Sequence, residues 1–124
     1  MSEILFKEES FKIIGICMEI HTALGIGLKE INYKDAMEIE FQALNIPYER
    51  EKKFIVKYKG KMLKSPYIAD FMVFNSFILE IKSVPVIIDA HIAQTLSYLN
   101  VSNTKLGIII NFDEKSLKWQ RVIL

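Results

Sequence analysis

Three charged residues interrupt two apolar segments in the middle of this 124-residue sequence. Asp70 lies within the run 67–74, and Glu80 and Lys82 lie within the run 77–84. An isolated charge in an apolar interior is strongly disfavoured, so these residues need partners. One ammonium group beside two carboxylates leaves one negative charge unpaired. A hard divalent cation, Mg²⁺ or Mn²⁺, would neutralise that excess through oxygen ligands.

Lys82 follows Glu80 by two positions, which places both side chains on the same face of a strand. An ammonium group there would orient or deprotonate a water molecule and balance the negative charge that develops on a phosphate. The pattern therefore indicates a metal-dependent phosphodiesterase in which Asp70 and Glu80 bind the metal. The residues alone leave open a buried ion pair in which Lys82 neutralises one carboxylate.

The two apolar runs that carry these charges are rich in Ile, Phe and Val. This composition predicts two strands buried on both faces, joined by a turn at Asn75-Ser76. Before them, apolar residues recur at helical spacing and predict helices over 7–24 and about 29–44. The inward stripe of the first helix is expected to contain Phe11, Ile14, Cys17, Met18 and Leu24.

After Pro47 the period changes to two: Phe54, Val56 and Tyr58 alternate with Ile55, Lys57 and Lys59. This predicts a strand with one wet face, which ends at a turn at Gly60-Lys61. Asp89 is expected to cap a third helix that continues to about Leu99. The order ααβββαββ predicts an α/β (α+β) fold with a mixed sheet, and a single domain over residues 1–124. Two final strands are expected at 106–112 and 119–124.

Strand register decides whether Asp70 and Glu80 share a face. A two-residue turn would pair Asp70 with Ile81 and direct Asp70 away from Glu80. A shared metal site requires instead a three-residue connection, 75–77, which pairs Asp70 with Lys82, or a bulge that shifts the face by one residue.

Polar residues also lie on the inward stripes of two predicted helices. Glu30 should point towards the sheet, although a first-turn glutamate that interacts with the helix dipole gives the same pattern. Gln94 and Tyr98 lie four apart and share a helix face, either as hydrogen-bonding groups near the site or as an ordinary polar flank. His21 and His91 are each a weak signal, since most histidines are core or surface residues.

Lysines crowd the first predicted hairpin, with Arg50 beside them. A solvated edge that lysines protect from aggregation explains this pattern well. A basic cluster next to the carboxylate strands would also contact phosphates, with Lys57, Lys59 and Lys61 as substrate-binding residues. The six lysines of this segment are Lys52, Lys53, Lys57, Lys59, Lys61 and Lys64.

Composition limits the other function classes. A formal net charge of +1 gives no strong overall field towards a polyanion, so nucleic-acid binding must depend on local charge. The apolar runs are much shorter than the ~20 residues that cross a bilayer, and the first residues lack a basic region before an apolar one. We therefore expect a soluble cytoplasmic protein with no membrane partner, which folds alone or as a small oligomer such as a homodimer.

Residues 27–33 (GLKEINY) resemble the signature of the GxxExxY proteins, which are placed in the PD-(D/E)XK nuclease superfamily. The resemblance runs over essentially the whole chain. It implies a restriction-endonuclease-like core and Mg²⁺- or Mn²⁺-dependent hydrolysis of nucleic acid, with DNA as the expected partner. Further matching segments are 20–21, 24–25, 67–70 (YIAD), 80–82 (EIK), 90–99 and 107–112.

The resemblance implies a role for each matching residue. Asp70 and Glu80 would bind the metal, with the backbone carbonyl of Ile81 as a further ligand. Lys82 would be the catalytic lysine. Glu30 matches the glutamate with which many superfamily members support or extend the metal site.

Gln94 and Tyr98 resemble the QxxxY element of the nuclease domains in bacterial recombination helicase-nucleases, where it shapes the site and holds the substrate strand. His21 would approach the metal, as an upstream histidine does in some of those domains. The chain departs from the family where Ile68 replaces a frequent Arg, which puts a phosphate or carboxylate contact in doubt. It also has LGIG at 24–27 where LGPG is frequent, which affects the rigidity of a turn.

Two alternatives to a nuclease are compatible with the sequence. The first is a nucleic-acid-binding or assembly module that keeps the nuclease fold without turnover. The second is a structural domain with a buried charge cluster, which would bind no metal.

Overall fold

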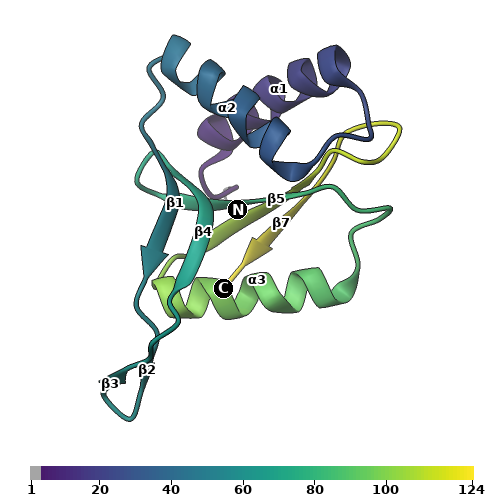
Figure 1. Ribbon diagram of the computed structural model, residues 1–124. Helices are drawn as coiled ribbons and strands as arrows, with labels where there is room; N and C mark the ends of the chain where they lie inside the picture. The colour runs from purple at the N-terminus through teal and green to yellow at the C-terminus, as the bar shows by residue number, and fades with distance from the viewer. Residues whose placement is uncertain (1–3) are drawn as a thin grey trace.

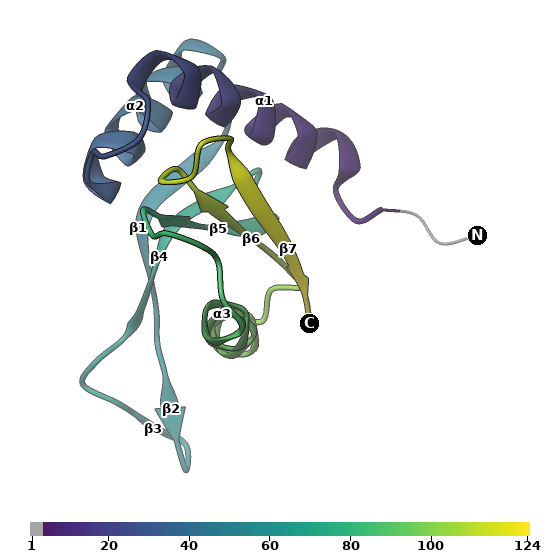
Figure 2. The same ribbon diagram turned by 90° about the vertical axis from the view of Figure 1, so that its right-hand side faces the viewer.

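A computed structural model describes residues 4–124, in which helices cover both faces of a mixed sheet (Figure 1). Helices α1 and α2 lie on one face and α3 lies on the other (Figure 2). The elements are α1 (Lys7–Leu24), α2 (Glu30–Ala43), β1 (Tyr48–Phe54), β2 (Lys57–Tyr58), β3 (Lys61–Met62), β4 (Tyr67–Val73), β5 (Phe77–Lys82), α3 (Asp89–Ser102), β6 (Leu106–Asn111) and β7 (Lys118–Ile123).

The main sheet has five strands in the order β1-β4-β5-β6-β7, and β2 pairs with β3 in a separate hairpin. Neighbouring strands are antiparallel except β5 and β6, which are parallel and are joined through α3. The predicted mixed α/β fold and the order ααβββαββ are therefore confirmed for the three helices and the main sheet. Within residues 4–124, no helix is long and apolar enough to cross a membrane.

The first strand differs from its prediction. It occupies β1, Tyr48–Phe54, and the chain leaves the main sheet after Phe54 to form the β2–β3 hairpin. Half-buried and exposed residues alternate from Tyr48 onwards. The sequence does not show this alternation, because charged residues occupy some of the half-buried positions. Arg50 is one of them, and its guanidinium is paired on α2 with Asp35 at 2.7 Å and Glu38 at 2.9 Å.

The inward stripe of α1 is confirmed only in part. Ile14 and Cys17 are buried as expected, but the stripe also contains Ile13 and Ile20, whereas Phe11, Met18 and Leu24 are exposed. An excess of apolar residues in α1 permits more than one helical phase, and the sequence does not say which phase meets the sheet.

Asp89 does not cap α3, which it begins as the first helical residue. The capping position belongs to Ile88, whose N–H donates to Nδ1 of His91 at 3.1 Å. His91 thus has a structural role at the start of α3, in place of the expected aspartate.

The core has two parts, one on each face of the sheet. Under α1 and α2, Tyr33 stacks on Phe112 with ring centroids 4.4 Å apart. Under α3, Leu99 packs against the strands, and a Cβ on Gly107 would lie 3.2 Å from its Cδ2 atom. Glycine at this position of β6 therefore allows α3 to approach the sheet closely.

Strands β1 and β4 both change face at one level of the sheet. Tyr48 packs with the α1–α2 core and Phe54 with the α3 core, although residues six apart in a regular strand share a face. The change occurs at Glu51, whose φ is 54°, opposite Asp70. Neither residue belongs to the β1–β4 ladder, which contains the pairs on either side of them. The irregularity resembles a bulge shared by two strands.

The connection between β4 and β5 has three residues, 74–76, because Val73 pairs with Phe77. The two-residue turn and the pairing of Asp70 with Lys82 are therefore both wrong. The observed register would place Asp70 opposite Glu80, although the ladder itself ends one pair earlier, at Phe71 and Leu79. Directly opposite residues project to the same side, so the condition for a shared site is met by a different register.

Candidate active site

Asp70 lies in the gap that opens between β4 and β5. Its Oδ2 atom accepts a hydrogen bond from the backbone N–H of Ile81 at 2.7 Å. The carboxylate therefore takes the place of a backbone carbonyl where the β4–β5 ladder has ended at Phe71 and Leu79. This contact fixes Asp70 beside the strand that carries Glu80 and Lys82.

Glu80 is a buried carboxylate in the centre of the sheet, with only 6% of its surface exposed. Its Oε1 atom accepts a hydrogen bond from the hydroxyl of Tyr67 at 2.6 Å. The Tyr67 ring lies in an aromatic stack with Phe54 at 5.7 Å and Tyr98 at 4.0 Å. Packing thus holds the hydroxyl in place, and the hydroxyl holds Glu80.

Burial, and after it the negative charge of Asp70, raise the pKa of Glu80 to about 8. The hydrogen bond from Tyr67 acts in the opposite direction and favours the ionised carboxylate. Near neutral pH and without a cation, the pair therefore carries a proton. A bound divalent cation would displace that proton, because its charge favours the carboxylate form.

The free energy of unfolding of the metal-free protein should fall as pH rises from about 4.5, the ordinary pKa of Glu80, to about 8. In this window the folded state keeps a proton that the unfolded state has lost, which destabilises the fold by at most about 1.4 kcal/mol per pH unit. Urea unfolding at several pH values in EDTA measures this slope. Glu80→Gln, which stays neutral, should flatten it, and an equal slope in both proteins would contradict the pKa shift.

Lys34 is a site residue that the sequence analysis missed. It lies on α2, and its Nζ atom is 3.0 Å from Oδ1 of Asp70 and 2.5 Å from Oε1 of Glu51. Burial lowers the pKa of Lys34, but the hydrogen bonds to Glu51 and Asp70 outweigh this and leave the pKa raised. Lys34 directly follows Tyr33, which belongs to the apolar stripe of α2. That position was the one indication in the sequence that Lys34 is buried.

Lys82 is half-buried at the end of β5, two residues after Glu80. Within residues 4–124, its ammonium makes no hydrogen bond or ion pair, and its backbone carbonyl accepts the N–H of Phe112 at 3.0 Å. The buried ion pair that the sequence left open is thus formed by Lys34 instead. Among the described residues, the ammonium group of Lys82 therefore has no partner that would compete with a ligand.

The structure places Glu30 beside the site but not between the two carboxylates. It is the exposed first residue of α2, and its Oε2 atom accepts the N–H of Ser83 at 3.3 Å. Glu30 therefore ties the start of α2 to the residue that follows Lys82. Its role in supporting a metal remains a prediction.

The other predicted residues do not contact Asp70 or Glu80 directly. Tyr98 stacks on Tyr67 and so supports Glu80 through one intervening ring. Gln94 is exposed one turn earlier on α3. His21 makes a 2.8 Å hydrogen bond between Nε2 and the carbonyl of Glu114, in the loop before β7.

Asp70 and Glu80 fit a hard cation by the chemistry of their donor set. Mg²⁺ typically takes one or two protein carboxylates and completes its shell with water and substrate phosphate. The described part of the chain contains no cluster of three acidic, histidine or cysteine side chains suited to a metal. These two carboxylates would therefore hold the cation, with the carbonyl of Ile81 as the predicted further ligand.

The lysines predicted to bind substrate are not at the carboxylates. Lys57, Lys59 and Lys61 are exposed on the β2–β3 hairpin, which projects from the body of the protein past α3 (Figures 1 and 2). The ammonium of Lys59 lies 5.4 Å from the ring centroid of Tyr58. We name residues 55–66, which contain this hairpin, the lysine arm.

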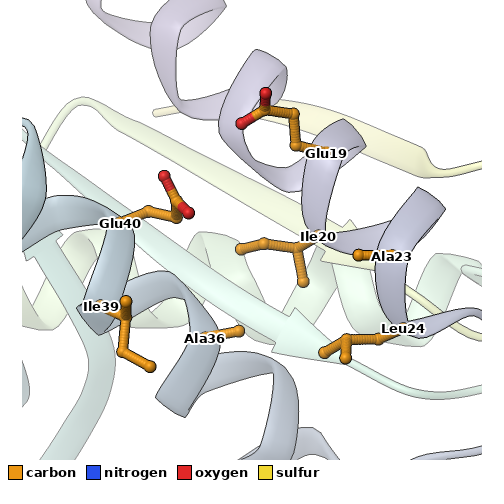
Figure 3. A pocket seen from close by; sticks show the side chains of 7 residues that line it. All are labelled: Glu19, Ile20, Ala23, Leu24, Ala36, Ile39 and Glu40. Atoms are coloured by element: carbon orange, nitrogen blue, oxygen red, sulfur yellow. The ribbon is translucent and has the colours of Figure 1, made fainter.

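A separate apolar pocket lies between α1 and α2 (Figure 3). It contains none of the predicted catalytic, metal-binding or substrate-binding residues, and its lining is largely aliphatic. The carboxylate site and this pocket are therefore distinct features. The residues that line the pocket are Glu19, Ile20, Ala23, Leu24, Ala36, Ile39 and Glu40.

Comparisons with known proteins give a family and a fold. Residues 7–122 match the family model described as PD-(D/E)XK nuclease superfamily. The crystal structure of SSO0001 is similar with a TM-score of 0.57 and 20% sequence identity, over 73% of this chain and 47% of that chain. Such a likeness shows the fold alone, and this chain spans about half the length of SSO0001. No curated protein matches the sequence.

Proposed function

This chain belongs to the PD-(D/E)XK nuclease superfamily, and on that premise we propose that it hydrolyses phosphodiester bonds of DNA with Mg²⁺ or Mn²⁺. The observation that carries the proposal is the convergence of Asp70 and Glu80 at the gap between β4 and β5. Lys82 follows on the same strand with an ammonium group that has no side-chain partner within residues 4–124.

Each residue then has a stated task. A bound divalent cation would supply charge neutralisation on the phosphate and a lowered pKa for water. Asp70 and Glu80 would hold the cation, and Lys82 would orient the water or balance the charge that develops on the phosphate. Tyr67 would keep Glu80 in the correct orientation, as groups behind metal ligands commonly do.

We also infer that the chain is a GxxExxY protein, from the segment 27–33. Within that segment, Glu30 would stabilise the end of β5 through Ser83 and so keep Lys82 in position. Tyr98 would support the site through Tyr67, and exposed Gln94 would contact the substrate strand.

The direct test is incubation of the purified protein with single-stranded and duplex DNA, in Mn²⁺, in Mg²⁺ and in EDTA. The proposal expects cleavage only with metal. The second candidate, a module that binds DNA without turnover, expects metal-dependent stabilisation and DNA binding but no product. Absence of product, metal binding and DNA binding together would refute both functions.

The lysine arm is the part of the chain best suited to DNA by its charge. Residues 55–66 contain four lysines and no acidic residue, so all fifteen acidic and twelve of the sixteen basic residues lie elsewhere. A two-stranded hairpin fits the major groove of B-form DNA, whereas the deep, narrow major groove of duplex RNA excludes it. These features favour duplex DNA as the substrate.

Reversal of three arm charges, Lys57→Glu, Lys59→Glu and Lys61→Glu, should weaken DNA binding by at least about tenfold near physiological salt. The plot of log affinity against log salt concentration should also become less steep, its negative slope decreasing in magnitude by about three, one for each lost phosphate contact. Fluorescence anisotropy over a range of salt concentrations measures both quantities.

The matched control reverses three exposed lysines outside the arm, Lys7, Lys12 and Lys115, and so makes the same change in net charge. We expect a smaller loss of affinity and a slope near that of the wild type. If the control and the arm variant behave alike, only overall charge matters and the arm has no specific role.

A further inference from the structure

One lysine and three carboxylates meet where β4 leaves β5. Lys34 is only 9% exposed, and lysine is seldom buried to this degree without a charged partner. It has two such partners, Glu51 at 2.5 Å and Asp70 at 3.0 Å. Asp70 in turn acts electrostatically on Glu80, so the four charges belong to one site.

A backbone distortion in β1, opposite Asp70, places Glu51 in contact with the ammonium group of Lys34. Glu51 adopts a φ of 54°, an uncommon conformation for a residue with a side chain, in the middle of β1. The distortion turns its carboxylate towards α2, where it meets Lys34. Without Glu51, the ammonium of Lys34 would have Asp70 as its one acidic partner among the described residues.

We propose that Lys34 is a positioning residue that supplies a fixed positive charge beside Asp70, so that the active site takes one divalent ion and not two. This inference rests on the proposed metal-dependent function. In two-metal sites the ions lie about 3.5–4 Å apart and share carboxylate ligands. A second ion would need the oxygens of Asp70 and Glu51 that Lys34 already contacts.

Charge balance leads to the same number of ions. The three carboxylates of the site, on Glu51, Asp70 and Glu80, would bring three negative charges to a bound cation. Lys34 and one divalent ion neutralise them completely. A second divalent ion would leave two positive charges in a partly buried site, which is unfavourable unless Lys34 leaves.

The test is a titration with Mn²⁺, followed by electron paramagnetic resonance, of the wild type, Lys34→Gln and Lys34→Arg. The wild type should bind one ion per chain. Lys34→Gln removes a positive charge next to a metal ligand and should bind its first ion at least about tenfold more tightly. Lys34→Arg keeps the charge and should bind one ion with wild-type affinity, within about threefold.

The outcomes separate this inference from the proposed function. Two ions bound to the wild type, or unchanged or weaker affinity in Lys34→Gln, would overturn the role of Lys34 while a metal-dependent nuclease still stands. No Mn²⁺ binding by any of the three proteins would refute both. The number of ions bound by the wild type decides the inference even if Lys34→Gln does not fold.

Discussion

Replacing Lys82 by alanine should lower the rate of DNA cleavage by about 10²- to 10⁴-fold, the range typical of a positioned acid, base or charge. The same variant should bind Mn²⁺ as the wild type does, because Asp70 and Glu80 are untouched. Its stability should change little, since the ammonium makes no ion pair within residues 4–124 that the substitution would break.

Single-turnover cleavage and a Mn²⁺ titration on the same preparation measure the two effects separately. Lys118→Ala provides the control, because Lys118 is an exposed lysine on the neighbouring part of the sheet. A Lys82→Ala protein that cleaves at the wild-type rate would exclude Lys82 from the reaction. If Lys82→Ala lost Mn²⁺ binding together with cleavage, Lys82 would be needed for the structure of the metal site and not for the reaction itself.

Removing either carboxylate should abolish the stabilisation by metal. If Mn²⁺ binds only the folded state, a concentration one hundred times the Kd stabilises the wild type by about 2.7 kcal/mol. For a domain of this size that corresponds to a rise in Tm of roughly 10 °C. Asp70→Asn and Glu80→Gln should show almost none of it, because each loses one of the two charged ligands, and cleavage should be lost with it.

These two substitutions are chosen to keep the hydrogen bonds to Ile81 and Tyr67, although Asp70→Asn turns an amide nitrogen towards Lys34 and loses that contact. An asparagine at position 70 still offers an oxygen to the N–H of Ile81, and a glutamine at 80 still accepts from Tyr67. Glu19→Gln, on the outer pocket between α1 and α2, serves as the control and should keep the full rise in Tm. Equal shifts in Tm for all four proteins would place the metal elsewhere.

The sequence was sufficient to predict the strands that carry the chemistry. The apolar runs around Asp70 and Glu80 are long, rich in β-branched residues and separated by turn residues, so β4 and β5 lie close to their predicted positions. The spacing of Glu80 and Lys82 also fixed their common face. These features depend on local pattern, which the sequence contains directly.

The register was not predictable in the same way. Phe74 has a φ of 55° and leaves the strand, while its N–H donates to the carbonyl of Pro47 at 2.8 Å. An aromatic residue is a poor candidate for that conformation, so the sequence favoured a turn at Asn75 and Ser76 alone. The length of the turn, and with it the register, depends on the contact of Phe74 with Pro47, which is distant in the sequence. A contact of this kind leaves no pattern in the local sequence.

Lys34 and Glu51 were missed for a related reason. A lysine in an amphipathic helix and a glutamate in the charged segment of β1 are both expected to face solvent. Each is brought into the site by the other and by Asp70, which comes from a third element. A network of this kind becomes visible only when α2, β1 and β4 are assembled.

The divergence of β4 from β5 at Asp70 also bears on how the protein can change over time. Beyond this point β1 and β4 continue as a two-stranded ribbon that ends in the exposed tip at Lys59 and Gly60. Loop tips of this kind accept insertions readily, and extra loop length costs little free energy. Recognition elements could therefore be gained or exchanged at the tip in descendants of this chain, while the carboxylates stay where the main sheet holds them.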